Sequence, residues 1–256
     1  MPRRPRIDFA GFHHIVNRGV ARTDIYLCSD DKNKFLEILC KACKLYRVNV
    51  HDYCLMDNHY HLLLELTEEN LSLLMRQINS NYAIYFNKKY NRLGHLWQGR
   101  YKSYYVVNES YLFTLYKYIE QNPIQAKMSE YIGQYEFTLL ATFLQNSLNI
   151  IECARHSQLL ELLKEDGVLE HLELNLNDDE LQKLKEEQKR KIEIKEHELK
   201  LHKLKSIEEH LSGYNNKEER NNAMFSAIKD GYTQASIAKY LNVSTSTISK
   251  IVKRFE

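Results

Sequence analysis

The sequence predicts an α+β fold in which helices pack on a small antiparallel sheet, followed by a charged linker helix and an all-α module. Two observations support this prediction. Short apolar or alternating segments, typical of strands, interchange with longer segments whose apolar residues recur at helical spacing. Their order is strand, helix, strand, strand, helix, loop, strand, helix, which favours a layered arrangement. We expect a main domain at residues 1–150, a charged helical region at 151–211 and a small domain at 212–256.

Local signals bound each element of the main domain. Gly19 marks the turn that ends the first strand, Asp30 is a helix-capping residue type, and Met56-Asp57-Asn58 forms the turn between two paired strands. Asn122-Pro123 stops the last helix, because proline disfavours helical geometry in the residue before it. The predicted strands are 12–17, 47–53, 59–66 and 104–107, and the predicted helices are 30–46, 71–90 and 109–121.

Composition and charge point towards a nucleic-acid partner. The net charge of +2 is unevenly spread, with basic residues in excess at 1–127 and 212–256 and acidic residues in excess between them. Basic regions are where phosphate contacts are expected. The chain has 18 tyrosines, many of them between Tyr82 and Tyr135, and tyrosine stacks on bases as well as filling cores. No apolar run reaches membrane-spanning length, so we expect no membrane partner.

The cysteines favour a reducing, cytoplasmic location. There are five, an odd number, and no signal peptide precedes them. Cys40 and Cys43 form a C-x-x-C, but no second such pair follows. Both fall in a predicted amphipathic helix, where residues three apart simply share a face. We therefore do not predict zinc there.

Residues 232–253 are typical of a helix-turn-helix. Ala238 is the small residue where two helices cross, and Asn242 can take the left-handed turn conformation. Val243 and Ile248 are expected in the core. A protein-binding three-helix module is the alternative, but the basic balance favours DNA. The residues expected to face DNA are Ser244, Thr245, Ser246, Thr247 and Lys250.

Two short motifs predict a metal-assisted site. On the strand at 59–66, His59 and His61 share one face because successive side chains alternate. Tyr118 and Asn122 are four apart on a helix and also share a face. If that face packs over the histidines, a cation can be held by both imidazoles and the Asn122 amide, with Tyr118 beside it. A pair of satisfied core histidines is the alternative reading. His13 and His14 point to opposite faces, so at most one joins the site.

The chemistry of this set favours transesterification of a phosphodiester. Two neutral imidazoles and a neutral amide leave the charge of a divalent cation undiminished, so that it can polarise a phosphate. Attack by Tyr118 would give a phosphotyrosine ester and a free 3′-hydroxyl, whereas a hydrolytic nuclease would use carboxylates and water. Mg²⁺ prefers oxygen ligands, so Mn²⁺ is at least as plausible on these side chains.

Four segments in order resemble the REP-associated tyrosine transposases, which belong with the insertion-sequence single-tyrosine transposases and their His-hydrophobic-His motif. The segments are residues 11–19 (GFHHIVNRG), 53–64 (YCLMDNHYHLLL), 94–103 (GHLWQGRYKS) and 118–126 (YIEQNPIQA). The resemblance covers roughly residues 1–140. Relatives usually carry Pro at the position of Asp57 and a smaller aliphatic residue at that of Tyr60. We expect a looser turn from the first departure and altered packing from the second.

The resemblance implies a ferredoxin-like catalytic domain that acts on single-stranded DNA, often beside a hairpin. It implies that His59 and His61 bind Mg²⁺ or Mn²⁺, that Asn122 is the third ligand and that Tyr118 is the nucleophile. We expect the protein to be a monomer or a homodimer and to bind duplex DNA through the helix-turn-helix.

Further DNA contacts are expected from basic residues near the predicted site, and the loop at 91–102, with the single tryptophan Trp97, suits backbone clamping and base stacking. These basic residues are Arg3, Arg4, Arg6, Arg18, Arg76, Arg100 and Lys102. Two other functions stay open: a non-catalytic DNA-binding regulator that uses residues 212–256, and an RNA-processing enzyme that uses the same pocket.

Overall fold

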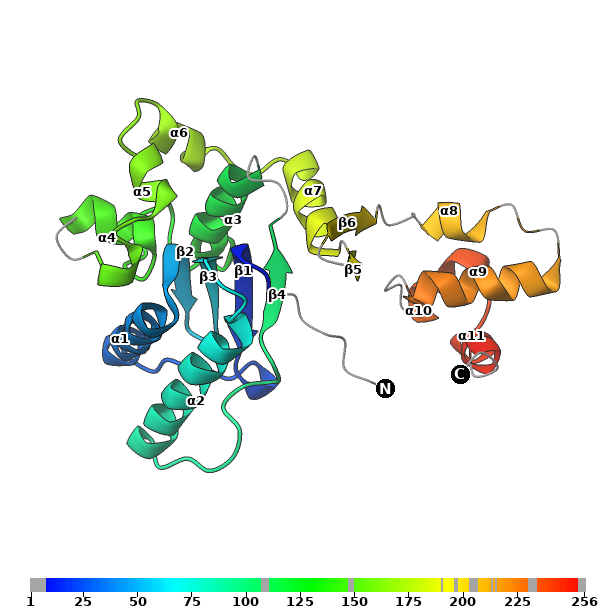
Figure 1. The fold of residues 1–256 in the computed structure, drawn as a ribbon, viewed down its shortest axis with the longest axis horizontal. Coiled ribbons are helices and arrows are strands. Elements are labelled where there is room, and N and C mark those ends of the chain that lie inside the picture. The colour runs from blue at the N-terminus through cyan, green and yellow to red at the C-terminus, as the bar shows by residue number, and fades with distance from the viewer. Residues whose placement is uncertain are drawn as a thin grey trace. The chain divides into compact units, whose positions relative to one another are not determined.

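A computed structural model of the chain (Figure 1) divides into two compact units, Met1–Leu184 and Lys185–Glu256. The structure describes residues 8–106, 111–146, 150–189, 191–195, 198–202, 207–212, 214, 216–229 and 234–252.

The first unit is built on a four-stranded antiparallel sheet. Its strands are β1 (Gly11–Arg18), β2 (Val48–Met56), β3 (His59–Leu66) and β4 (Lys102–Tyr105), in the order β2-β3-β1-β4. β3 therefore has a neighbour on each side, with His61 opposite Val16 of β1 and Cys54 of β2. Because both edges of β3 are paired, the backbone that carries the two predicted histidines is held firmly.

Helices cover both faces of the sheet. α1 (Ser29–Tyr46) and α2 (Leu71–Lys89) lie on the face to which Tyr60 points: its ring packs 4.8 Å from that of Phe35, and its hydroxyl donates to Asn79 Oδ1 at 2.8 Å. α3 (Leu112–Gln125) lies on the opposite face, to which His61 points. The alternation expected for a strand therefore separates Tyr60, which packs in the core, from His61.

Several element boundaries differ from those predicted: β2 continues three residues further, to Met56, so that the turn before β3 is Asp57-Asn58, and α3 begins at Leu112 instead of residue 109. Two further differences bear on the site. β4 begins at Lys102, two residues early, because Lys102 pairs with Val16 of β1. α3 continues through Pro123 to Gln125 instead of ending at residue 121. Pro123 lies in the last turn, where a missing N–H costs only one helical hydrogen bond, and burial of the proline compensates for that loss. The extension keeps Asn122 on the same helix face as Tyr118.

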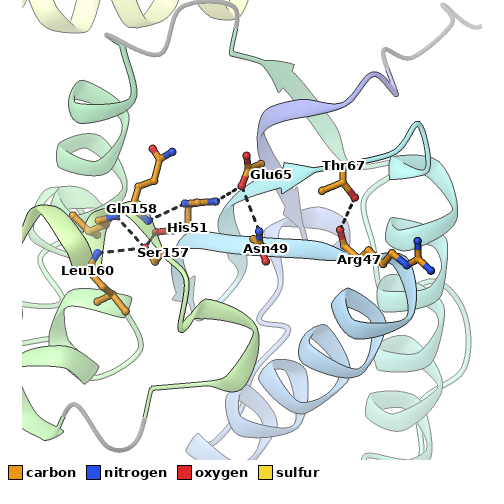
Figure 2. A network of polar contacts seen from close by, with 9 residues as sticks. Arg47, Asn49, His51, Glu65, Thr67, Ser157, Gln158 and Leu160 are labelled. Carbon is orange, nitrogen blue, oxygen red and sulfur yellow. Dashed lines mark hydrogen bonds and ion pairs between the residues drawn. The ribbon is translucent and has the colours of Figure 1, made fainter.

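Short helices follow in the first unit: α4 (Leu139–Asn146), α5 (Gln158–Leu162) and α6 (Val168–Glu173). α7 (Asp178–Lys189) begins in the first unit and ends in the second. Figure 2 shows how α5 is fixed to β2 through His51. The Ser157 hydroxyl donates to the His51 carbonyl at 2.6 Å and caps α5, and the Gln158 N–H donates to His51 Nδ1 at 3.0 Å. The other ring nitrogen of His51 lies 2.9 Å from Glu65 on β3.

The charged linker helix predicted within residues 151–211 is wrong at Lys191–Lys195 and Glu198–His202. It is replaced by an antiparallel pair, β5 (Lys191–Lys195) and β6 (Glu198–His202). Their sequences, KIEIK and ELKLH, alternate with the period of a strand, and this local signal outweighs the helix-forming composition.

Four helices end the second unit: α8 (Ile207–Leu211), α9 (Lys217–Lys229), α10 (Gln234–Leu241) and α11 (Thr245–Val252). Leu211, Ile237, Ala238 and Ile248 belong to their shared core. Asn242 takes the predicted left-handed conformation, with φ of 53°. Val243, which we expected in this core, is 39% exposed, because it lies in the turn beyond the packed helix faces.

A disulfide joins Cys40 of α1 to Cys153, a pairing that the sequence analysis did not predict. Among the described residues, no helix has the length and apolar character needed to cross a membrane.

The Ser157→Ala substitution removes both the α5 cap and the buried hydrogen bond to His51. We expect the free energy of unfolding to fall by ~1–3 kcal/mol, since a lost cap and an unpaired buried carbonyl each cost about 1 kcal/mol. Urea denaturation followed by circular dichroism measures the change. Ser80→Ala, at an exposed position of α2, is the control, and an equal effect of the two substitutions would contradict this role for Ser157.

Candidate active site

The predicted chemical residues meet in one cavity of about 580 Å³. It opens between the ends of β1 and β3, the loop before β4, and α3. The two histidines of β3 and the Tyr118 and Asn122 pair of α3 all contribute to its wall. The residues that line it are Val16, Asn17, Arg18, Arg22, Asn58, His59, His61, Gln98, Gly99, Arg100, Lys102, Tyr118 and Asn122.

Hydrogen bonds orient both imidazoles. His59 Nδ1 lies 2.6 Å from Asn58 Oδ1, which can only accept, so His59 Nδ1 carries the proton and Nε2 keeps its lone pair. His61 Nδ1 lies 2.9 Å from Nε2 of His14, whose ring stacks on it at 5.2 Å. His14 is therefore the histidine of the His13–His14 pair that joins the site, whereas His13 bonds Ser103 and the Phe9 carbonyl.

All three imidazoles of the site are kept neutral. Burial lowers the pKa of His14 to about 3 and that of His61 well below its ordinary value, with His14 and His59 adding to the effect on His61. Burial and the charge of Arg18 also lower the pKa of His59. A neutral imidazole is the form that binds a metal, so no proton needs to be displaced from either predicted ligand near neutral pH.

Tyr118 and Asn122 complete the group from α3. The Tyr118 ring lies 5.6 Å from that of His61, edge to face. Asn122 Nδ2 donates to the Tyr118 carbonyl at 2.6 Å, which leaves Asn122 Oδ1 as the amide atom available to a ligand. Burial raises the pKa of the Tyr118 phenol, Tyr104 adds to this rise, and the Asn122 amide opposes it. The phenol is therefore protonated at neutral pH and requires activation before it can act as a nucleophile.

These atoms fit a divalent cation. Among the described residues, His59 Nε2 and Asn122 Oδ1 have no hydrogen-bond partner, and His61 Nε2 keeps its lone pair when its Nδ1–H is donated to His14. A borderline ion such as Mn²⁺ accepts two imidazoles and an amide oxygen, and water can complete its shell. Within the described part of the chain, no three His, Cys, Asp or Glu side chains form a metal-binding group. A metal site at His59 and His61 therefore needs the Asn122 amide oxygen as its third protein ligand.

The predicted basic residues do not all reach the cavity. Arg18, Arg100 and Lys102 line it, and Arg22, which the sequence analysis missed, lines it too. Arg76 is exposed on α2 and is not among the lining residues. Arg3, Arg4 and Arg6 lie outside the described residues.

The predicted DNA-facing residues of the second unit lie at the start of α11. Ser244, Thr245 and Thr247 are exposed. The Ser244 hydroxyl accepts from the Thr247 N–H at 3.2 Å and bonds the Thr247 hydroxyl at 2.8 Å, so this pair caps the helix. The side chains of Ser246 and Lys250 lie outside the described residues.

The loop before β4 is fixed against the end of β1. Val20 N–H donates to the Leu96 carbonyl and Gln98 N–H to the Arg18 carbonyl, each at 2.9 Å. Trp97, which we expected to suit base stacking, instead packs edge to face on Tyr60 and donates from Nε1 to the Asn79 carbonyl at 2.9 Å. The loop therefore places Arg100 at the cavity while its tryptophan serves as a packing anchor.

The polar cavity residues that the sequence analysis did not assign are Asn17, Asn58, Gln98 and Arg22. The sequence does point to Asn58, because Asn58 lies in the turn immediately before His59. No such signal points to Gln98 and Arg22, because they reach the cavity only through the pairing of the loop before β4 with the end of β1.

Substituting His14 tests the support of His61. We expect His14→Phe, which keeps a buried ring but removes the nitrogen facing His61, to weaken Mn²⁺ binding ~10–100-fold, the usual cost of losing an outer-shell partner. Calorimetric titration with Mn²⁺ measures the affinity. His13→Phe is the matched control in the same strand and should leave affinity unchanged; equal affinities in the two variants would contradict this role.

Comparison with known proteins gives a match to one family and to solved structures, each over part of the chain. Residues 10–122 match the family described as "Transposase IS200 like". A REP-associated tyrosine transposase bound to a REP hairpin is 18% identical, with a TM-score of 0.47 over 59% of this chain and 88% of that one. A protein described as a transposase from Deinococcus radiodurans R1 is 17% identical, with a TM-score of 0.34 over 47% and 97% of the respective chains. No curated protein matches. Over residues 10–122, a little under half of its length, the chain is similar to the IS200-like transposase family.

Proposed function

We propose that the protein cleaves and transfers single-stranded DNA through a covalent 5′-phosphotyrosine ester on Tyr118. One observation carries the proposal: Tyr118 lies against His61 in the same cavity as His59, Asn122 and four cationic side chains. Among the described residues that line the cavity there is no carboxylate, and a hydrolytic nuclease would use carboxylates to activate water. The arrangement favours attack by a protein hydroxyl.

The residues divide the work between binding and reaction. Arg18, Arg100 and Lys102 hold the DNA backbone through its phosphates. His59, His61 and Asn122 would hold Mg²⁺ or Mn²⁺, which when bound offsets charge on the scissile phosphate. The Tyr118 oxygen bonds to phosphorus as the 3′ oxygen leaves. The phenol loses its proton and the departing oxygen gains one, so the ester retains the energy needed to rejoin a strand.

The finer fold and partner assignments are parts of the same proposal. The strand order β2-β3-β1-β4, with two helices on one face, supports a ferredoxin-like domain. The sequence motifs shared with REP-associated tyrosine transposases support hairpin-bearing single strands as the substrate. In this proposal residues 1–150 form the catalytic domain and residues 151–211 connect it to the C-terminal module. The protein is a cytoplasmic monomer or homodimer.

We also propose that residues 212–256 bind duplex DNA as a helix-turn-helix. The left-handed Asn242 between α10 and α11, the buried Ala238 and the exposed start of α11 support this reading. A chain that footprints duplex DNA but never cleaves with either metal would favour the alternative, a non-catalytic regulator.

Covalent capture tests the nucleophile. With Mn²⁺ and a labelled hairpin-bearing single strand, the intact chain should form a DNA adduct that survives denaturing electrophoresis. Tyr118→Phe should abolish it, because the attacking oxygen is gone. Tyr104→Phe is the matched control, since its ring lies 5.8 Å from that of His14, and it should keep the adduct. If the adduct were lost in Tyr104→Phe and persisted in Tyr118→Phe, the nucleophile would be Tyr104 and not Tyr118.

Salt dependence tests the cavity cations. Arg100→Ala should weaken single-strand binding and reduce the slope of log affinity against log salt by ~0.7, the contribution of one phosphate contact on a single strand. Fluorescence anisotropy at several salt concentrations measures it. Arg76→Ala removes the same charge away from the cavity and should leave the slope unchanged. Equal slopes in both variants would show that Arg100 makes no phosphate contact.

A further inference from the structure

We propose a second metal site, a Cys₃His zinc site formed by Cys40, Cys43, Cys153 and His156. The C-x-x-C at residues 40–43 has a counterpart 113 residues later, the C-x-x-H at residues 153–156. Two such pairs supply the four ligands of a tetrahedral structural zinc. The site is separate from the Tyr118 cavity and does not depend on the proposed strand transfer.

Local geometry aligns the two ligands within each pair. Cys40 and Cys43 lie three residues apart on α1, so their side chains are neighbours on one helix face. Cys153 and His156 lie in a turn of 3₁₀ type, where Ala154 N–H bonds the Ile151 carbonyl and Ser157 N–H bonds the Ala154 carbonyl. Side chains three apart eclipse each other in such a turn.

The fold brings the two pairs together. The Cα atoms of Cys40 and Cys153 are 5.1 Å apart, and the Cys153 N–H donates to Cys40 Sγ at 3.4 Å. All four proposed ligands line one cavity of about 510 Å³. Three thiolates and a neutral imidazole would leave a zinc complex with one net negative charge. Arg155 on the same wall offsets it, whereas Lys44 lies 3.9 Å from Glu152, which also lines the cavity, and Arg47 lies 3.4 Å from Glu68.

The backbone beside the second pair is already anchored. Ser157 directly follows His156, and its hydroxyl donates to the His51 carbonyl at 2.6 Å (Figure 2). Gln158 N–H donates to His51 Nδ1 at 3.0 Å. The turn that carries Cys153 and His156 is thereby held on β2, and zinc would fasten the same turn to α1.

The Cys40–Cys153 disulfide and the zinc site are alternative uses of the same thiols. With that bond formed, the described residues include no group of three His, Cys, Asp or Glu side chains arranged for a metal. In the reduced chain, three thiols release three protons to solvent and their sulfurs bind one Zn²⁺, with no change of oxidation state. A disulfide needs only Cys40 and Cys153, so Cys43 and His156 discriminate between the two uses.

The test measures zinc in the full chain, expressed with zinc and purified under a reductant. His59→Ala and His61→Ala are included throughout so that the Tyr118 cavity contributes no metal. We expect one zinc per chain by plasma mass spectrometry, and at least a tenfold lower content after adding Cys43→Ser or His156→Ala. Cys28→Ser, which changes an exposed free cysteine, is the matched control and should keep the zinc.

Cobalt gives a readout that does not depend on how well the variants fold. Co²⁺ added to the reduced chain without the Cys43 or His156 substitution should produce intense thiolate-to-metal absorption in the near ultraviolet. A reduced chain that binds neither zinc nor cobalt through sulfur would overturn the proposal. So would zinc content unchanged by both Cys43→Ser and His156→Ala, since a disulfide alone would then account for the cysteines.

Discussion

The antiparallel pairing of β3 between β1 and β2 is the constraint on which the site depends. It fixes His61 opposite Val16 and turns His59 and His61 towards α3, while Tyr60 points into the core. A slip of one residue would exchange these faces and bury the histidines under α1 and α2. The aromatic packing around Tyr60 therefore protects the register that the chemistry needs, although Tyr60 takes no part in that chemistry.

Burial performs two opposed tasks at the cavity. It keeps the imidazoles neutral and ready to bind a cation, and it also raises the pKa of the Tyr118 phenol. The second effect makes the unaided phenol a weaker nucleophile at neutral pH. The same low-dielectric surroundings strengthen the electrostatic interaction between the Tyr118 oxygen and any positive charge beside it. On the proposed function, such a site would stay inactive until a cation and a phosphate are bound together, which would prevent cleavage of DNA at random.

Periodicity made most of the first unit predictable. The strands, α1 and α2 lie within a few residues of their predicted places because buried faces impose alternation or helical spacing. The meeting of His59, His61, Tyr118 and Asn122 in one cavity was also predictable, because each pair sits within a single element. What depends on contacts between distant segments was not: Arg22 and Gln98 reach the cavity only through a loop pairing, and Cys153 meets Cys40 across 113 residues. Asp57, expected only to loosen a turn, pairs with Lys32 at 2.9 Å.

The central claim is that His59, His61 and Asn122 hold one cation beside Tyr118. Anomalous diffraction from crystals of the Tyr118→Phe chain, grown with Mn²⁺ and a hairpin-bearing single strand, tests it most directly. The account predicts one manganese peak in the cavity, bonded to Nε2 of both histidines, to Oδ1 of Asn122 and to a phosphate oxygen. A peak away from the histidine pair, or coordination through His61 Nδ1, would contradict it.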